Sequence, residues 1–164
     1  GNDGSIMTFA KTNSGYQAPT GCDYTLTKTE SGYAITDFAT GKKHMFNEYG
    51  LLVALEDTEG NRTTLGYDIN FRLTQITSPS GKVYTIALDG QETITSVGLP
   101  DGNKISYTYD SAGNLVSVTD PTGAIRYEYN SAHFMTAWYD ENGNRVIFNE
   151  YDAEGRVTTQ TDAL

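Results

Sequence analysis

Pairs of an aromatic and a polar residue recur along the chain about every 21 residues. The residues that open these pairs, including one degenerate leucine copy, are Phe46, Tyr67, Leu88, Tyr109, Tyr129 and Tyr151. We call each of them the origin of a unit; successive origins are 21, 21, 21, 20 and 22 residues apart. A fixed period of this length indicates a tandem array of small units that cover one another's apolar residues.

Two apolar positions and one glycine keep the same place in the units. The apolar residues six after the origin are Leu52, Leu73, Ile94, Leu115, Met135 and Val157. The residues nine after it are Leu55, Ile76, Val97, Val118 and Trp138, with Gln160 as the polar exception. The glycines fourteen after it are Gly60, Gly81, Gly102, Gly123 and Gly143. Short apolar segments between regularly spaced glycines predict strands separated by turns.

Each unit is expected to hold two strands and two turns. The segments 110–113 and 120–123 both begin with Asp, which bonds to the backbone two residues later, and end with Gly, which accepts a positive φ. Between them, residues 104–109 alternate apolar and polar side chains, as a half-buried strand does. We therefore predict an all-β fold, in which hairpins join as an antiparallel meander and form a curled β-strip.

The turn glycines carry two further expectations. A Gly123→Val substitution should destabilise the fold strongly, because a β-branched residue resists a positive φ. At the first turn of three units, Phe71, Glu92 and His133 stand where the other units have glycine. These three turns are therefore predicted to differ from the rest.

The spacing of apolar residues points to β-bulges. Positions six and nine have opposite parity, so a regular strand would place Leu115 and Val118 on different faces. Either a bulge lies between them, or both faces of the sheet are partly buried. The distance from origin to glycine is constant, so changes of length fall in the second strand, and the extra residue in 146–151 predicts a bulge there.

Residues 1–45 follow the period less well. They are rich in turn residues, and 24–28 and 33–36 are typical of strands. No Pro/Ser/Gly linker separates them from the array, so we interpret 1–45 as a divergent lead-in to the same sheet and 46–164 as the tandem repeats, in one structural domain. No segment keeps apolar residues at helical spacing over three turns, and no helix is predicted.

Composition limits the partners. The 164 residues include 11 Lys and Arg against 21 Asp and Glu, a formal net charge of −10, which argues against nucleic acid. No apolar run is long enough for membrane insertion. Cys22 is the one cysteine, which excludes an internal disulfide and a cysteine-built metal site, and we expect a buried or half-buried thiol. The chain begins with Gly1 and not with Met, so we expect it to be a piece of a longer protein.

Aspartates at the predicted turns are the first candidate site. They are Asp57, Asp68, Asp89, Asp101, Asp110, Asp120, Asp140, Asp152 and Asp162. Calcium needs six to eight oxygens that converge on one point, whereas consecutive turns of a meander fall on opposite edges. Asn47, Ser78 and Asn130 also replace Asp at the same positions. We favour turn chemistry over weak cation binding, and we assign no metal site.

Tyrosines form the second candidate site, as a platform for sugars or as cross-strand packing. They are Tyr67, Tyr84, Tyr107, Tyr109, Tyr127, Tyr129, Tyr139 and Tyr151. Packing is favoured because aromatic residues suit a pleated, half-buried surface. His44 and His133 stand without a nucleophile motif, so we assign no catalytic residue and no cofactor. The Asn61-Arg62-Thr63 sequon is expected by chance at this length.

Residues 109–129 (YDSAGNLVSVTDPTGAIRYEY) resemble the YD repeat of the RHS family, Y-D-x-x-G-x-L-x-x-V-x-D-x-x-G with an aromatic return strand. The likeness covers 46–162 by repetition, and 3–45 more weakly resemble the region before the repeats in Gram-positive wall-associated RHS proteins. Similar repeats occur in teneurins and in a subunit of insecticidal toxin complexes. The resemblance implies a β-strip that winds into a shell around a C-terminal cargo, often a toxin. Asp120–Gly123 matches four letters of the family's self-cleavage segment and is explained as a turn.

Three functional hypotheses follow. The first is a non-catalytic shell segment of a secreted or cell-surface, wall-associated RHS protein, whose partners are neighbouring repeats and the C-terminal effector domain. The second is an adhesive module that binds glycans or a surface protein through exposed Tyr residues. The third, a hydrolase, rests only on abundant carboxylates. Edge-to-edge self-association is a further expectation, because unpaired strand edges are templates for pairing.

Overall fold

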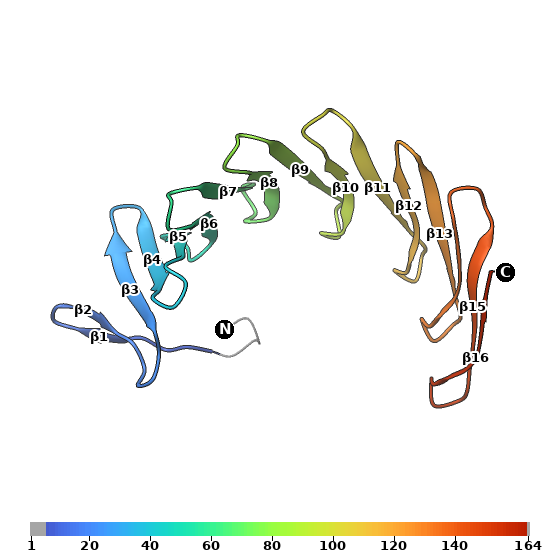
Figure 1. Ribbon diagram of the computed structural model, residues 1–164, viewed down its shortest axis with the longest axis horizontal. Coiled ribbons are helices and arrows are strands. Elements are labelled where there is room, and N and C mark those ends of the chain that lie inside the picture. Colours follow the sequence, from blue (N-terminus) through green and yellow to red (C-terminus); the bar gives the residue numbers. More distant parts are fainter. Residues whose placement is uncertain (1–5, 164) are drawn as a thin grey trace. The chain divides into compact units, whose positions relative to one another are not determined.

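The computed structural model describes residues 6–163, and every regular element in this range is a β-strand. Strands β1 and β2 form a two-stranded sheet, and β3–β16 form a fourteen-stranded antiparallel sheet in which spatial order equals chain order (Figure 1). The predicted all-β antiparallel meander is confirmed. No helix of these residues could cross a membrane.

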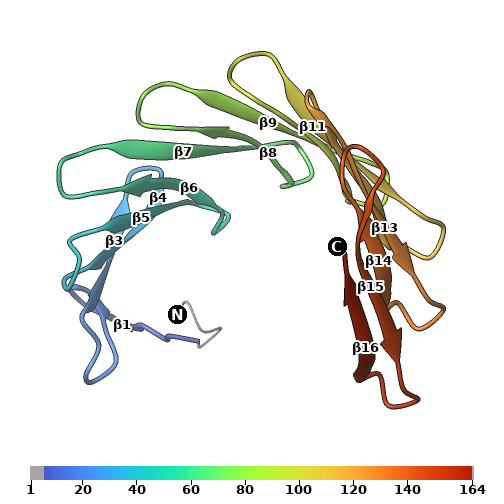
Figure 2. The ribbon, with the colours of Figure 1, turned by 45° about the vertical axis from the view of Figure 1, so that its right-hand side comes forward.

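The chain divides into two compact units, with the boundary after Val83. The strands of the first unit are β1 (Ala10–Thr12), β2 (Gly15–Gln17), β3 (Tyr24–Thr29), β4 (Gly32–Asp37), β5 (Lys43–Asn47), β6 (Leu52–Glu56), β7 (Arg62–Tyr67) and β8 (Leu73–Thr77). The second unit holds nearly all of β9 (Val83–Leu88) and then β10 (Ile94–Gly98), β11 (Lys104–Tyr109), β12 (Leu115–Asp120), β13 (Gly123–Tyr129), β14 (Met135–Tyr139), β15 (Arg145–Tyr151) and β16 (Val157–Asp162). In Figure 2, β13–β16 lie side by side, as their pairing requires.

A β-bulge at position seven of each unit settles the parity of its apolar residues. In β12, Leu115 lies opposite Tyr109 and Ser117 opposite Thr108, so Val116 is the extra residue. The bulge brings Leu115 and Val118 to the same face, beside the tyrosines of β11. The extra residues of the six units are Val53, Thr74, Thr95, Val116, Thr136 and Thr158.

The bulge predicted in residues 146–151 is confirmed. Ile147 lies opposite Trp138, while Arg145 lies opposite Tyr139, so Val146 is the extra residue of β15. This insertion explains why the last complete unit is the longest. The strand absorbs one residue without a change in the pairing that follows.

The prediction of different first turns at Phe71, Glu92 and His133 is wrong. All three residues have a left-handed φ, of 64°, 65° and 65°, close to the 84° of Gly113 in the same position. Their hydrogen bonds are also the same, since each N–H donates to the carbonyl of the residue three before it. The pairing of the flanking strands therefore imposes the turn, at a cost of roughly 1–2 kcal/mol for each left-handed side chain.

The expected positive φ at Gly123 is also wrong. Gly60, Gly81, Gly102 and Gly143 are left-handed, with φ between 79° and 88°, but Gly123 is not. Gly123 pairs directly with Asp120 across a two-residue turn. The turns at Gly60, Gly81, Gly102 and Gly143 each have three residues, and the glycine is the third of them. The shorter turn explains the 20-residue spacing of this unit.

Glycine at position 123 still has a reason. A Cβ built there would lie 2.5 Å from the Cβ of Glu141, which belongs to the neighbouring turn on the same edge of the sheet. A Gly123→Val substitution is thus opposed by close approach of a side chain and not by backbone conformation. Because the Cβ of Glu141 is fixed by its own backbone, one of the two turns must move to admit a side chain at position 123.

The buried core is thin. Among the described residues, only Gly32, Ala34, Ala54, Ala137 and Asn149 are buried, and most apolar side chains of the strands are half-buried. A single sheet layer gives each side chain neighbours along the face and none above it. Stability therefore depends heavily on turns and on hydrogen bonds between strands.

The lead-in joins the sheet in part. β4 pairs with β5, so β3 and β4 continue the fourteen-stranded sheet, whereas β1 and β2 pair only with each other. The Tyr16 ring of β2 contacts the Tyr33 ring of β4 edge-on, with centroids 6.1 Å apart. The first five residues of the predicted lead-in lie outside the described residues. The domain boundary at 45/46 stays a prediction.

Candidate functional site

The aspartate that follows the origin closes its turn with both carboxylate oxygens. In Asp110, Oδ1 accepts the N–H groups of Ala112 and Asn114, both at 2.9 Å, and Oδ2 accepts Nδ2 of Asn114 at 2.8 Å. The same three bonds form at Asp68 and Asp152, which also follow an origin, and at Asp57 and Asp140 in the second turns; the side-chain donors are Arg72, Arg156, Asn61 and Asn144. This geometry supports the turn interpretation of the aspartates, and no group of metal-binding side chains gathers within residues 6–163.

These hydrogen bonds favour the ionised carboxylate. The bonds from Asn114 lower the pKa of Asp110 below its usual value of 3.8. Hydrogen bonds within the turn likewise lower the pKa of Asp37, Asp57, Asp68, Asp101, Asp120, Asp140 and Asp152. The turns thus contribute stability while these carboxylates are ionised.

Acidification below pH 4 is expected to lower the melting temperature. Because the folded-state pKa values are depressed, the stabilisation is complete above the unfolded pKa of about 3.9 and is lost as the pH falls through the folded values. Circular dichroism melts from pH 7 to pH 2 measure this loss. Below the isoelectric point of about 4.4 the chain also becomes net positive, and the growing repulsion between its cations lowers the stability over the same range.

A matched variant separates the two effects. Asp110→Asn keeps the Oδ1 acceptor of the turn, as Asn47 and Asn130 do naturally. We expect this variant to lose less stability than the unsubstituted chain between pH 4 and pH 2. An equal loss in both proteins would contradict the role of the ionised Asp110.

Tyrosine hydroxyls bridge neighbouring hairpins where the strands diverge. The Tyr67 hydroxyl donates to the carbonyl of Leu52 at 2.7 Å, beyond the last β6–β7 pair at Ala54 and Thr64. The same bond joins Tyr109 to Ile94 at 3.1 Å and Tyr151 to Met135 at 2.6 Å. In each case an origin tyrosine satisfies the carbonyl at position six of the unit before it, next to the bulge.

A Tyr67→Phe substitution is expected to destabilise the fold by about 0.5–1.5 kcal/mol, because it leaves the Leu52 carbonyl without this donor. Urea unfolding followed by fluorescence measures the change. Tyr127→Phe is the control, since the Tyr127 hydroxyl has no hydrogen-bond partner among the described residues, and it should be neutral. Equal losses in the two variants would show that the hydroxyl bridge adds nothing.

Gln160, the polar exception at position nine, has a partner in Asn149. Asn149 lies two residues before its origin, where the other units place His44, Leu65, Ile86, Tyr107 and Tyr127. It is 5% exposed and lies opposite Gln160. Its Oδ1 accepts Nε2 of Gln160 at 3.0 Å, and its Nδ2 donates to the Met135 carbonyl at 3.3 Å. A polar pair thus replaces the apolar cross-strand pair of the other units.

The histidines do not form a common site. His44 lies on β5 in the first compact unit, opposite Leu55, and His133 lies in a turn of the second. The Nδ1 atom of His133 is 2.7 Å from Oδ1 of Asn114, so this ring links two successive first turns. The histidines therefore hold structural positions, and a hydrolytic centre gains no support from them.

Cys22 and the sequon lie apart from the candidate site. Cys22 is half-buried, with Sγ 3.5 Å from Sδ of Met7, as expected for a packed thiol. The residues of the sequon are at the turn before β7 and in its first two positions. Neither observation adds a reactive or binding group.

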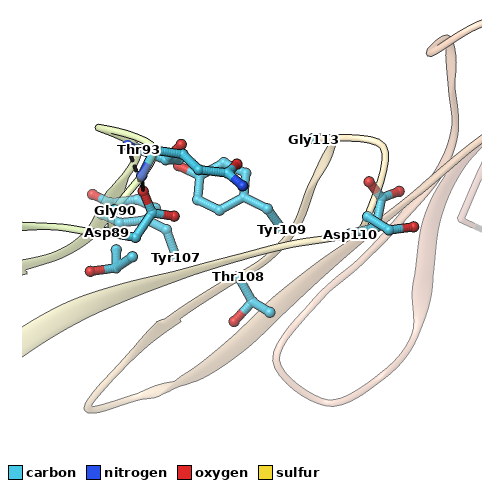
Figure 3. A pocket seen from close by; sticks show the side chains of 11 residues that line it. Asp89, Gly90, Thr93, Tyr107, Thr108, Tyr109, Asp110 and Gly113 are labelled. Atoms are coloured by element: carbon cyan, nitrogen blue, oxygen red, sulfur yellow. Dashed lines mark hydrogen bonds between the residues drawn. The ribbon is translucent and has the colours of Figure 1, made fainter.

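A cleft opens between two hairpins of the second unit. It measures about 640 Å³ and lies between the β9–β10 and β11–β12 turns, where β10 and β11 no longer pair. We call it the Asp89 cleft; its lining includes Asp89, Gln91, Tyr107, Tyr109 and Asp110. Figure 3 shows Asp89, Tyr107 and Tyr109 close together, with Asp110 on the next hairpin. The sequence pattern points separately to Asp89, Asp110 and the two tyrosines but not to the cleft, since only strand divergence creates it.

Comparison with known sequences identifies a repeat family. The family described as Teneurin YD-shell matches residues 24–163. "Probable deoxyribonuclease RhsB" of Dickeya dadantii (strain 3937) is 32% identical over 121 residues, which cover 71% of this chain and 8% of that protein. "Probable deoxyribonuclease RhsA" of the same strain is 29% identical over 120 residues, with the same coverage. The chain thus spans a small part of these relatives.

Solved structures share the fold. A TcdB2–TccC3–Cdc42 crystal structure matches with a TM-score of 0.60 and 13% identity, over 95% of this chain and 10% of that one. The Photorhabdus luminescens Tc holotoxin pore matches with a TM-score of 0.53 and 12% identity, over 95% and 11%. At such low identity the likeness concerns the meander of strands and not the chemistry of any site.

Proposed function

Because the chain belongs to the teneurin YD-shell family, we propose that it is a wall segment of a β-shell that encloses or presents a C-terminal, toxin-like domain of a longer protein. The observation that carries this proposal is the uninterrupted meander from β3 to β16, with a bulge in the same place of every unit. Each unit pairs with the next in the same way, so the array extends by repetition. Its partners are the neighbouring repeats and the enclosed domain.

The wall role requires no catalytic group in this segment. The described aspartates of the first turns serve their own turns, and the histidines hold structural positions. Chemistry in the longer protein then resides in another domain. The names of the RhsA and RhsB relatives, which include a nuclease activity, fit such a division of labour.

Limited proteolysis of the full-length protein tests the proposal. A domain enclosed by the shell should resist protease in the intact protein and be digested quickly when expressed without the repeats. Ala137→Glu, which forces a charge into a position that is 1% exposed, should release the domain, whereas Thr119→Ser should not. Equal digestion of the domain with and without the repeats would refute enclosure.

We further propose that the longer protein is secreted or displayed at the cell surface, with attachment to the cell wall as the finer possibility. The net charge of −10 suits a soluble wall that does not bind nucleic acid. Fractionation of the producing cells, with detection of this segment by antibody, distinguishes medium, wall and cytoplasm. Recovery only from the cytoplasm would contradict the proposal.

An adhesive module is the second candidate, favoured by an exposed apolar patch on the first unit. Tyr49, Ile69 and Phe71 are 69%, 91% and 53% exposed, and the rings of Tyr49 and Phe71 lie 5.3 Å apart. Such a patch is typical of a binding surface. Arrays of glycans and surface proteins, probed with this chain and with a Tyr49→Ser variant, test it. If the patch is adhesive, the unsubstituted chain should bind a glycan or protein on the array and the Tyr49→Ser variant should not.

A further inference from the structure

We propose that the Asp89 cleft binds the cationic side chain of a basic polypeptide segment. The cleft combines an unused carboxylate oxygen with two tyrosine rings, in a chain of strongly negative charge. The identity of the polypeptide as cargo of the shell rests on the proposed function. The preference of the cleft for a cation rests on the cleft itself.

Asp89 differs from the aspartates at the same place in other units. Its Oδ1 accepts the N–H groups of Gln91 and Thr93 at 2.8 and 3.0 Å, as usual for this turn. Its Oδ2 accepts no hydrogen bond from the described residues, because Thr93 replaces the Asn or Arg found four residues after Asp68, Asp110 and Asp152. One carboxylate oxygen of Asp89 is thus free to accept a hydrogen bond from a ligand.

Two tyrosine rings line the same cleft as this carboxylate. Tyr107 and Tyr109 belong to β11 and share a face of the sheet (Figure 3). The Tyr109 hydroxyl is held by the Ile94 carbonyl, which fixes the ring within the cleft. An ammonium or guanidinium group binds well where a carboxylate and aromatic faces meet, since the ring quadrupole and the charge attract the same ion.

The lining of the cleft holds no cationic side chain that would compete with a bound ligand for the Asp89 carboxylate. No Lys, Arg or His is among the residues that line the cleft, and a second carboxylate, Asp110, lies on the next hairpin. Both oxygens of Asp110 are occupied within its own turn, so it adds attraction at longer range. A volume of about 640 Å³, open to solvent, admits a lysine or arginine side chain with its backbone.

Tripeptides test the preference for a cation. We would titrate this 164-residue chain with acetyl-Gly-Lys-Gly-amide and with the norleucine analogue, which has a similar shape and no charge, and follow backbone amide shifts by NMR. The lysine peptide is expected to bind with a dissociation constant on the order of 1 mM and to shift the amides of Asp89, Tyr107 and Tyr109. The norleucine peptide should bind at least roughly threefold more weakly.

Variants locate the interaction. Asp89→Asn keeps the Oδ1 acceptor of the turn and should weaken binding of the lysine peptide by roughly threefold to tenfold. Asp152→Asn removes the same charge from the same place in another unit and should change binding less than twofold, an effect of the order expected from net charge alone. Tyr107→Leu should weaken binding while the melting temperature shows that the chain remains folded.

Three results would overturn the inference. They are equal binding of the lysine and norleucine peptides, equal effects of the two Asp→Asn variants, and binding of neutral oligosaccharides at the cleft with no response to lysine. Protease protection of the C-terminal domain is measured separately on the full-length protein. The two experiments therefore fail independently: protection without peptide binding would contradict only the cation site, and peptide binding without protection would contradict only the shell.

Discussion

A Gly32→Ala substitution is expected to destabilise the chain by about 2–4 kcal/mol. Gly32 begins β4 with a φ of 149°, in a region that side chains rarely adopt. A Cβ there would overlap the carbonyl oxygen of Phe46 and the backbone of Asn47, its partner on β5. Backbone atoms within a paired strand cannot turn away as a side chain can, so β4 and β5 must separate.

Two other glycines provide controls for this prediction. A Cβ at Gly60 meets no atom within 4 Å, but its φ is 84°, so Gly60→Ala should cost roughly 1 kcal/mol. Gly90 has open space and no left-handed φ, and Gly90→Ala should be neutral. Urea unfolding of the three variants should therefore rank Gly32 above Gly60 above Gly90. A Gly32→Ala protein as stable as the Gly90→Ala protein would contradict the close approach of β4 and β5.

The Asn149–Gln160 pair gives the second large expected effect. Gln160→Val removes the donor to Oδ1 of Asn149, and this buried acceptor then has no partner, which should cost about 1–3 kcal/mol. In Asn149→Leu, the exposed Gln160 can hydrogen-bond to water, and the Met135 carbonyl still accepts the Tyr151 hydroxyl. The cost of this substitution should therefore be smaller. The double variant restores an apolar pair like Leu65 with Ile76 and should be close to neutral.

A double-mutant cycle measures the coupling. Free energies of unfolding for the four proteins should give an interaction energy of about 1–2 kcal/mol between positions 149 and 160. The side-chain hydrogen bond between Asn149 and Gln160 joins two directly paired residues, so the cycle reports a local effect. Additive costs of the two single substitutions would show that the two residues are independent.

The sequence predicted the repeating unit and its strands because both depend on local chemistry. Asp and Gly at fixed spacing specify the turns, and alternating side chains specify the strands. The conflict between Leu115 and Val118 even predicted a bulge as one of two solutions. It left the choice open because parity alone does not distinguish a bulge from a sheet buried on both faces.

The missed features depend on neighbours in space. Phe71 adopts a glycine-like turn because the paired strands on either side hold its backbone, and propensity alone predicted otherwise. Gly123 departs from its class because its turn is one residue shorter than the others. Gln160 departs from the apolar pattern because Asn149 lies opposite it on β15. A comparison of positions two before and nine after each origin would have revealed that pair, because both residues are polar only in the last unit.

The strict neighbour-to-neighbour order of the strands also shapes how the chain reaches its fold. From β3 to β16, each pairing joins strands that are adjacent in sequence, so every loop to be closed is short. Short closures cost little entropy, and low contact order favours fast folding. A strand can dock as soon as its predecessor is in place, which suits a wall that grows from the N-terminal side while the ribosome is still adding residues.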